Sequence, residues 1–147
     1  MSSERRRKTR VEGFFLAVER LSRDNKRASA GNIAEILGVA NGTASGSIRE
    51  LANAGWIDHQ PYAGAILTER GRNRLLVVLR KRQLLELFLV QTLHLQLDDA
   101  TDESWLIEPA ATEFLIERIN EYLDYPKSDI RGTSILVSAN KHTDYSD

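Results

Sequence analysis

The chain has 147 residues, of which 41% are hydrophobic, and it contains no cysteine. The lack of cysteine excludes disulfides, thiolate metal sites and cysteine nucleophiles. The most apolar stretch is interrupted by Arg80, Lys81 and Arg82, so it predicts no membrane span, and the first residues lack the apolar run of a signal peptide. We therefore expect a cytoplasmic protein that does not have a membrane as its partner.

The net charge of −1 conceals a strong division along the chain. Residues 1–82 carry 16 of the 20 lysines and arginines but only 8 of the 21 acidic residues, whereas residues 83–147 carry 4 and 13. A basic half joined to an acidic half is typical of a polyanion-binding module that carries a second module with another task. The alternative is a single fold with two solvated faces of opposite charge.

Apolar spacing predicts a mainly α protein with one short hairpin. In chain order the sequence predicts three helices, two strands around the turn "PYAG", and three further helices: 11–22, 30–38, 41–54, strands 56–60 and 65–68, then 69–91, 98–108 and 112–123. The expected N-caps are Ser29, Asn41, Thr68 and Thr112, the expected helix-ending glycines are Gly38 and Gly55, and Pro109 marks a join.

The order helix, helix, three-residue turn, helix and two-stranded wing is that of a winged helix-turn-helix. We therefore expect a winged helix-turn-helix DNA-binding domain followed by a helical dimerisation domain. The predicted boundaries are a basic arm over 1–10, the winged domain over 11–78, the dimerisation domain over 79–132, and a polar, loosely ordered tail over 133–147.

The second helix of the motif, within "GVANGTASGSIRELANAGW", is crowded with small residues, although each glycine in a helix costs about 1 kcal/mol against alanine. In this motif that helix enters the major groove of double-stranded DNA by its N-terminal end, so small residues let the backbone approach closely. The alternative, packing against a neighbouring helix, explains Ala44. The expected DNA contacts in this helix are Asn41, Gly42, Thr43, Ser45, Gly46, Ser47 and Arg49.

Basic residues around the motif suit the same interpretation. Arg5, Arg6 and Arg7 belong to the N-terminal arm, and Lys26 and Arg27 precede the first helix of the motif. We expect these five side chains to neutralise phosphates without reading base sequence.

The runs "GNIAEILGVANGTASGSIRELANAGWI", "LTERGR" and "RKRQLLELFL", with the acidic helix that holds Glu108, resemble the DtxR/MntR family of metal-dependent repressors. The similarity is to the short members, which lack the SH3-like third domain, and it extends from about Val11 to Leu123. It implies a homodimer, held by the C-terminal half, on a palindromic operator. The excess of apolar residues there predicts an interface that includes Leu84, Leu87, Phe88, Trp105, Phe114 and Leu115.

The resemblance also implies a Mn²⁺ or Fe²⁺ site, for which this sequence lacks most ligands. The family's ligand positions fall on Gly13, Leu16, Arg82, Glu86, Thr101, Trp105, Glu108 and Pro109. Only Glu86 and Glu108 keep a donor, and two carboxylates without an imidazole make a poor transition-metal site, so we expect no metal cofactor. Our hypothesis is that the Arg82 guanidinium replaces the charge of the metal. The alternative is that Arg82 points to solvent and that the dimer answers to an unknown ligand or partner.

The sequence has no Gly-rich phosphate loop, no nucleophile elbow and no Ser-His-Asp set, so we do not expect an enzyme. The predicted function is that of a DNA-binding transcriptional regulator, acting as a repressor. The alternative is a winged-helix module that binds protein or RNA and no operator.

Overall fold

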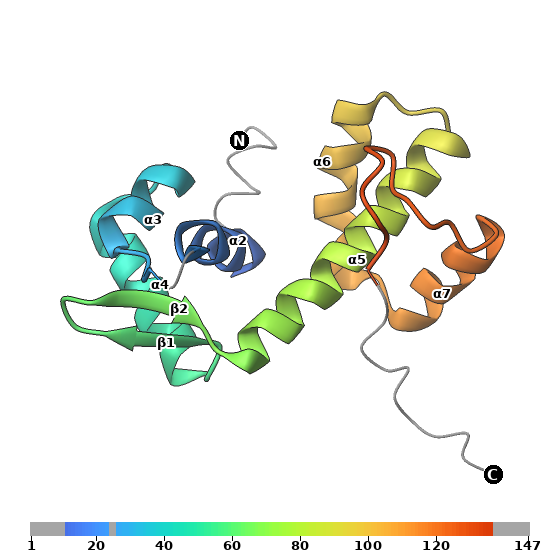
Figure 1. The fold of residues 1–147 in the computed structure, drawn as a ribbon. Helices are drawn as coiled ribbons and strands as arrows, with labels where there is room; N and C mark the ends of the chain where they lie inside the picture. Colours follow the sequence, from blue (N-terminus) through green and yellow to red (C-terminus); the bar gives the residue numbers. More distant parts are fainter. Residues whose placement is uncertain (1–10, 24–25, 137–147) are drawn as a thin grey trace, which may run out of the picture. The chain divides into compact units, whose positions relative to one another are not determined.

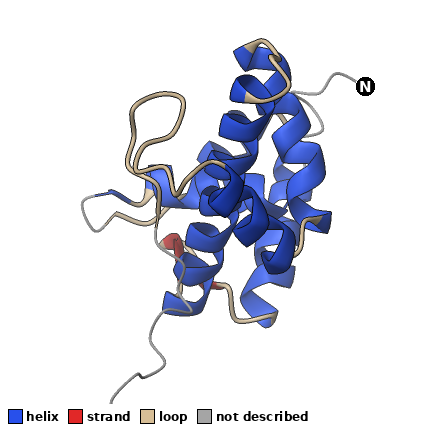
Figure 2. Cartoon of the chain, turned by 90° about the vertical axis from the view of Figure 1, so that its right-hand side faces the viewer, coloured by secondary structure: helices blue, strands red, loops and turns tan. Residues whose placement is uncertain are grey.

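The structure, a computed structural model, describes residues 11–23 and 26–136 (Figure 1). Two compact units divide the chain, Met1–Leu75 and Leu76–Asp147, and the division falls within the long helix α5 (Glu69–Gln91). Helices make up most of the described chain, as Figure 2 shows, which confirms the mainly α fold class. None of these described helices is long and apolar enough to cross a membrane.

The first unit contains the expected winged helix-turn-helix. Its elements are α2 (Val11–Leu21), α3 (Ala30–Leu37), α4 (Asn41–Asn53), β1 (Ile57–Gln60) and β2 (Gly64–Leu67). The two strands pair antiparallel, with Ile57 opposite Leu67 and Gln60 opposite Gly64. Phe15, Ile33 and Ile48 are fully buried. The core of this unit thus receives one fully buried apolar side chain from each of α2, α3 and α4.

Side-chain caps fix the start of several helices where the sequence predicted them. The Ser29 hydroxyl accepts a hydrogen bond from the Asn32 amide at 3.1 Å, and Thr112 does the same for Leu115 at 3.2 Å. The prediction for Asn41 was wrong. Ala40 is the N-cap of α4, because its carbonyl already accepts the Ala44 amide at 3.1 Å, and Asn41 is therefore the first helical residue.

The start of α5 packs closely on the end of α4. The Thr68 hydroxyl donates to the Gly55 carbonyl at 2.7 Å and accepts the Gly71 amide at 3.0 Å. A Cβ atom on Gly71 would lie 2.0 Å from the Trp56 carbonyl oxygen, so only glycine fits this approach. The Arg70 guanidinium covers the Trp56 ring at 3.9 Å, which closes the junction with a cation–π contact.

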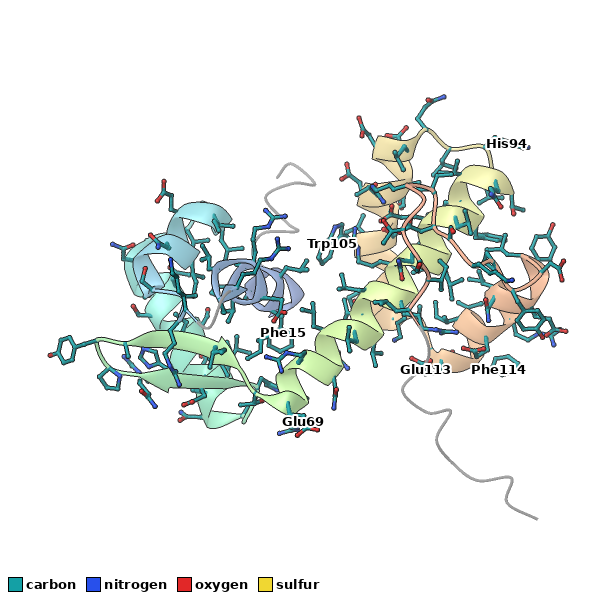
Figure 3. All side chains as sticks on the ribbon, viewed as in Figure 1. Phe15, Glu69, His94, Trp105, Glu113 and Phe114 are labelled. Atoms are coloured by element: carbon teal, nitrogen blue, oxygen red, sulfur yellow. The ribbon has the colours of Figure 1, made fainter. Side chains whose placement is uncertain are left out.

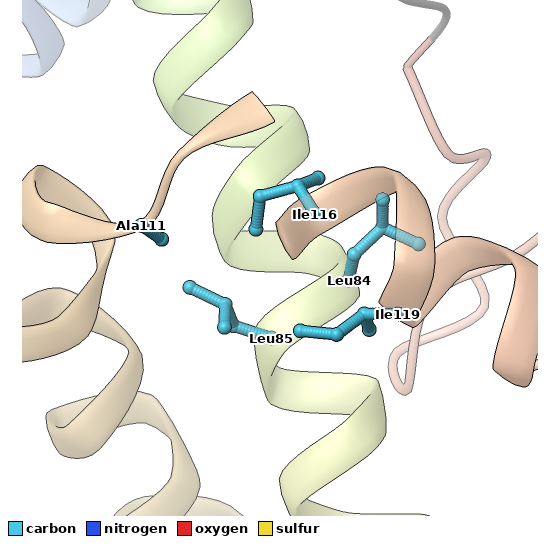
Figure 4. Packing of buried hydrophobic residues seen from close by; sticks show 5 residues of the cluster. All are labelled: Leu84, Leu85, Ala111, Ile116 and Ile119. Atoms are coloured by element: carbon cyan, nitrogen blue, oxygen red, sulfur yellow. The ribbon is translucent and has the colours of Figure 1, made fainter. Parts of the chain in front are cut away.

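The second unit contains the rest of α5 with α6 (Leu97–Ile107), a 3₁₀ turn η2 (Glu108–Ala110) that holds Pro109, and α7 (Glu113–Tyr122). Its apolar core joins α5 to α7 through five buried residues shown in Figure 4: Leu84, Leu85, Ala111, Ile116 and Ile119. Apolar burial of this kind contributes about 25 cal/mol per Å², so the cluster stabilises the packing of α7 on α5.

Residues 133–136, the start of the range expected to be a polar tail, are described and belong to a hydrogen-bonded loop. Residues 127–136 form a closed loop in which the Asp129 amide donates to the Thr133 carbonyl at 2.7 Å and the Ile135 amide donates to the Lys127 carbonyl at 2.9 Å. The backbone groups of residues 133 and 135 thus find partners within the loop itself. Residues 137–147 lie outside the described part of the chain.

Candidate DNA-binding face and buried ion cluster

The expected DNA-contacting residues of α4 lie outside its buried stripe. Ala44, Ile48 and Leu51 face the core, while the other positions are exposed or half-buried. Exposed residues are Asn41, Gly42, Thr43 and Arg49, and half-buried residues are Ser45, Gly46 and Ser47. The first turn of α4 therefore presents a hydroxyl, an amide and bare backbone to the outside.

The two glycines of this face are not required by packing within the described chain. A Cβ atom built on Gly42 or on Gly46 would meet nothing within 4 Å. The packing alternative therefore applies to Ala44, which is fully buried, and not to the glycines. Their small size leaves room for something outside the chain to approach the helix backbone.

The N-terminus of α4 also lacks a side-chain cap in the described structure, because its N-cap is Ala40. The first N–H groups of a helix have no partner within the helix, and they carry a partial positive charge. A phosphate is a suitable acceptor for such groups. By contrast, the Ser29 hydroxyl already occupies one amide at the start of α3.

Arg27 has a different place from the one expected. Its guanidinium binds the Asp58 carboxylate at 2.7 Å and donates to the carbonyls of Asp58 at 3.0 Å and Gly64 at 3.2 Å. Asp58 lies on β1 and Gly64 begins β2, so Arg27 fastens the wing. Both of its terminal nitrogens have partners within the chain, whereas Lys26 is exposed. Arg5, Arg6 and Arg7 lie outside the described residues.

The second unit contains a buried carboxylate with two cationic partners. Glu86, on α5, is 2% exposed. Nη2 of Arg82, one turn earlier, lies 2.9 Å from Glu86 Oε1, and Nη1 of Arg131 binds Glu86 Oε2. The Arg82 guanidinium also lies over the Trp105 ring at 3.9 Å from its centroid. Arg82 thus binds Glu86 and Trp105 and does not simply project into solvent.

Hydroxyl groups of α6 complete the surroundings of Glu86. The Ser104 hydroxyl lies 3.4 Å from Oε1, and the Thr101 hydroxyl lies 3.4 Å from Oε2. Thr101 also accepts Nη2 of Arg131 at 3.0 Å. A buried charge is tolerated when it is both paired and hydrogen-bonded, and Glu86 is both.

Glu108, the other carboxylate at a family ligand position, is 1% exposed at the end of α6. Lys81 Nζ lies 4.0 Å from its Oε1 and donates to the Ala111 carbonyl at 2.7 Å. Each of the two surviving carboxylates therefore has a cationic side chain of the chain itself beside it.

These surroundings do not fit a Mn²⁺ or Fe²⁺ ion at the implied positions. Among the described residues there is no group of three or more His, Cys, Asp or Glu that could hold a metal. Such ions prefer carboxylate, imidazole or water ligands, and a permanent cation at 2.9 Å from the Glu86 carboxylate opposes a second one. Gly13 and Leu16, at the implied first-helix positions, have no donor side chain.

The expected dimerisation residues fall into two groups. Leu84, Leu87 and Trp105 are 0%, 3% and 7% exposed within one chain, so the expectation that they offer surface to a partner is corrected. Phe114, labelled in Figure 3, is 78% exposed and Leu115 is 45% exposed. Phe88 is half-buried against the Tyr122 ring, at 5.9 Å between centroids. Leu84 packs inside the chain against Ala111, Ile116 and Ile119, and the Trp105 ring packs against the Arg82 guanidinium.

Sequence reasoning missed Arg131 and Lys81 as partners of the two carboxylates. One local signal was available for Glu86, because it interrupts the apolar run "LLELFL". A carboxylate in such a run faces a core and needs a cation. No local pattern identifies Arg131, which lies 45 residues further along the chain.

Comparisons with known proteins assign both units. Residues 9–65 match the family described as iron dependent repressor, N-terminal DNA binding domain, and residues 68–136 match iron dependent repressor, metal binding and dimerisation domain. The chain belongs to the iron-dependent repressor family. This confirms the resemblance to the DtxR/MntR family, and both domains of a DNA-binding transcriptional regulator are present.

Three relatives illustrate the similarity. An uncharacterized HTH-type transcriptional regulator of Methanocaldococcus jannaschii is 24% identical over 120 residues, covering 82% of this chain and 94% of that protein. A hypothetical protein of Sulfolobus solfataricus shares the fold, with a TM-score of 0.77, 19% identity and coverage of 86% and 96%. A manganese-dependent transcriptional repressor in complex with manganese has a TM-score of 0.72 and 34% identity, covering 84% of this chain but only 57% of that longer one.

Replacing both glycines of the α4 face by alanine should change stability and DNA affinity in opposite directions. Gly42→Ala with Gly46→Ala should stabilise the free protein by about 1–2 kcal/mol, because alanine favours the helix and both sites are open. The two methyl groups should weaken DNA binding roughly tenfold or more by holding the helix away from the groove. Thermal unfolding and gel retardation measure the two effects.

Gly31→Ala in α3 is the matched control, since its Cβ also meets nothing within 4 Å. It should give the same kind of stabilisation with little change in affinity. DNA binding by the double variant as tight as that of the unchanged protein would show that the wrong face has been assigned.

Proposed function

We propose that this protein is a transcriptional repressor that binds a palindromic operator in double-stranded DNA as a homodimer, and that it does so without catalysis. The observation that carries the proposal is the α4 face, where uncrowded glycines and an uncapped helix start coincide with exposed Thr43. The 34%-identical relative, a repressor by name, supports it. A cytoplasmic location follows from the proposal.

The composition of the face favours recognition through backbone approach and shape. Thr43 and Ser45 have short side chains that offer a hydroxyl to a phosphate or a base edge. The first two turns of α4, read as "NGTASGS", hold no arginine, lysine or glutamine for a bidentate base contact. We expect sequence preference to depend on groove shape, methyl contacts and water.

A second copy of the chain is proposed to cover the exposed apolar residues at the start of α7. Phe114 and Leu115 are adjacent and well exposed, and Tyr122 and Tyr125 add further exposed aromatic area at 67% and 60%. Apolar surface of this kind is characteristic of an interface. The family description, a dimerisation domain over residues 68–136, supports this location.

The dimer is proposed to be active without a metal ion. In the hypothesis, the guanidinium of Arg82 supplies at Glu86 the positive charge that a divalent ion supplies in metal-dependent relatives. The contact of 2.9 Å between them and the stacking of Arg82 on Trp105 support it. Arginine remains charged at any physiological pH, so this source of charge cannot be removed by chelation.

Gel retardation with genomic DNA fragments at two salt concentrations tests operator binding. Retardation should weaken steeply with salt, and Thr43→Ala with Ser45→Ala should reduce affinity about tenfold, which is the loss of two hydrogen bonds at roughly 0.5–1 kcal/mol each. The control is Asn53→Ala, at the exposed far end of α4. No retardation at low salt would favour the alternative, a module that binds protein or RNA.

Disrupting the α7 surface should give a folded monomer. Phe114→Ser with Leu115→Ser removes exposed side chains, so helical content should stay unchanged while sedimentation at micromolar concentration shifts from dimer to monomer. Tyr62→Ser, which alters a fully exposed aromatic at the wing, should leave the dimer intact. A double variant that sediments as a dimer would contradict the location of the interface.

Operator binding should be indifferent to chelation. Affinity measured in EDTA and with added Mn²⁺ or Fe²⁺ should be equal, and Arg82→Met should weaken operator binding without dissociating the dimer, because it removes the fixed charge beside Glu86. Binding that collapses in EDTA and returns with Mn²⁺ would overturn the hypothesis.

A further inference from the structure

The loop over residues 127–136 is fastened to α5 by one glutamine. Gln83 Nε2 donates to Asp129 Oδ2 at 3.0 Å and to the Ser134 carbonyl at 2.9 Å, while Gln83 Oε1 accepts the Leu136 amide at 3.1 Å. A single side chain makes all three contacts, so Gln83 fixes the position of the loop on α5.

Asp129 fixes the backbone from which Arg131 extends. Its Oδ1 accepts the amides of Arg131 and Thr133, each at 2.9 Å, and its backbone carbonyl accepts the Gly132 amide at 3.0 Å. A turn closed by an aspartate in this way has little conformational freedom. The Arg131 side chain therefore leaves the loop from a fixed origin.

Arg131 joins the loop to both helices. Its side chain is 46% exposed, yet its Nη1 reaches Glu86, whose side chain is 3% exposed. Its Nη2 donates to the Thr101 hydroxyl at 3.0 Å. Two neighbouring acceptors, one on α5 and one on α6, thus meet two nitrogens of one planar guanidinium, which presents its donors in a fixed fork.

A cavity of about 360 Å³ lies beside this contact. Polar and apolar side chains from α5 and from the loop line it, among them Leu79, Arg82, Gln83, Thr133, Ser134 and Leu136. A guanidinium ion is much smaller than this space, so the site can receive one from outside when the Arg131 side chain is absent.

We propose that Glu86 and Thr101 form a guanidinium-binding site, which the chain fills with its own Arg131, and that this contact holds α5, α6 and the 127–136 loop in the form that binds DNA. Arg131 is thus a positioning residue. The first half of the proposal stands independently, and the second half rests on the proposed function.

Chemical rescue tests the site. Arg131→Ala should lower the melting temperature by several degrees, because it leaves Glu86 with one cation fewer. Guanidinium chloride at tens of millimolar, far below the molar range that denatures, should raise it again. Sodium chloride and methylammonium chloride at equal concentration should not, since neither ion offers a planar fork.

Arg118→Ala is the matched control, because Arg118 pairs with Glu121 at 3.1 Å on the exposed side of α7. It should lower the melting temperature little and gain nothing from guanidinium. Equal melting temperatures for the two variants, or equal rescue by all three salts, would overturn the site. If Arg131→Ala does not fold, the two Thr101 variants test the site, because Thr101→Ser keeps the hydroxyl acceptor and Thr101→Val loses it. Thr101→Val should then melt at a lower temperature than Thr101→Ser. Equal melting temperatures for these two variants would also overturn the proposed guanidinium site.

Gel retardation tests the second half separately. Arg131→Ala should lose at least tenfold in affinity for retarded DNA and should regain most of it with guanidinium, whereas Arg131→Lys should be intermediate. Unchanged affinity of Arg131→Ala would overturn the positioning role. If the unchanged protein retards no DNA, the proposed function fails, while the melting temperatures still decide whether the guanidinium site exists.

Discussion

A negative charge buried between two helices constrains the whole C-terminal unit. An unpaired buried carboxylate costs several kcal/mol even after relaxation, so Glu86 is stable only with its partners in place. Those partners come from three segments: Arg82 from α5, Thr101 and Ser104 from α6, and Arg131 from the loop that follows α7. The loop between residues 127 and 136 has an ordered structure because Gln83, three residues from Glu86, holds it at the same place.

At the positions where the resemblance implies a metal site, this chain places cationic side chains beside Glu86 and Glu108. A divalent ion joins elements because it accepts several ligands at once, and it is lost when its concentration falls. A guanidinium joins fewer elements, but it is covalently part of the chain and always charged. The two carboxylates at family ligand positions have Arg82, Arg131 and Lys81 beside them, so the change concerns the whole site and not one ligand.

The DNA-binding unit follows a different constraint. Its core, with Phe15, Ile33 and Ile48, needs only ordinary apolar packing, whereas the first turn of α4 carries glycines that no internal contact requires. Helical glycine lowers stability by about 1 kcal/mol against alanine, which indicates that this face is shaped for a partner at some cost to the fold. Arg27 also joins the two strands of the wing, through Asp58 on β1 and Gly64 on β2.

Local signals made the secondary structure predictable. The hydroxyls of Ser29 and Thr112 cap their helices by accepting amides three residues further on. The spacing of apolar residues predicted where the helices lie along the chain. The prediction failed for Asn41 because α4 begins one residue earlier than the cap pattern indicated. Ala40 is the N-cap, and Asn41 is the first helical residue. The ion partners could not be predicted, since Arg27 meets Asp58 across 31 residues and Arg131 meets Glu86 across 45. Only the folded topology decides which cation reaches which carboxylate.

We propose that side chains of the chain, and not a metal ion, neutralise Glu86. Diffraction from a crystal of the purified protein grown with Mn²⁺, recorded at the manganese absorption edge, tests it most directly. We expect no anomalous peak between α5 and α6 and clear density for the Arg131 guanidinium on the Glu86 carboxylate. A strong anomalous peak on Glu86, with Arg82 and Arg131 turned away from it, would show that a metal ion neutralises this carboxylate instead.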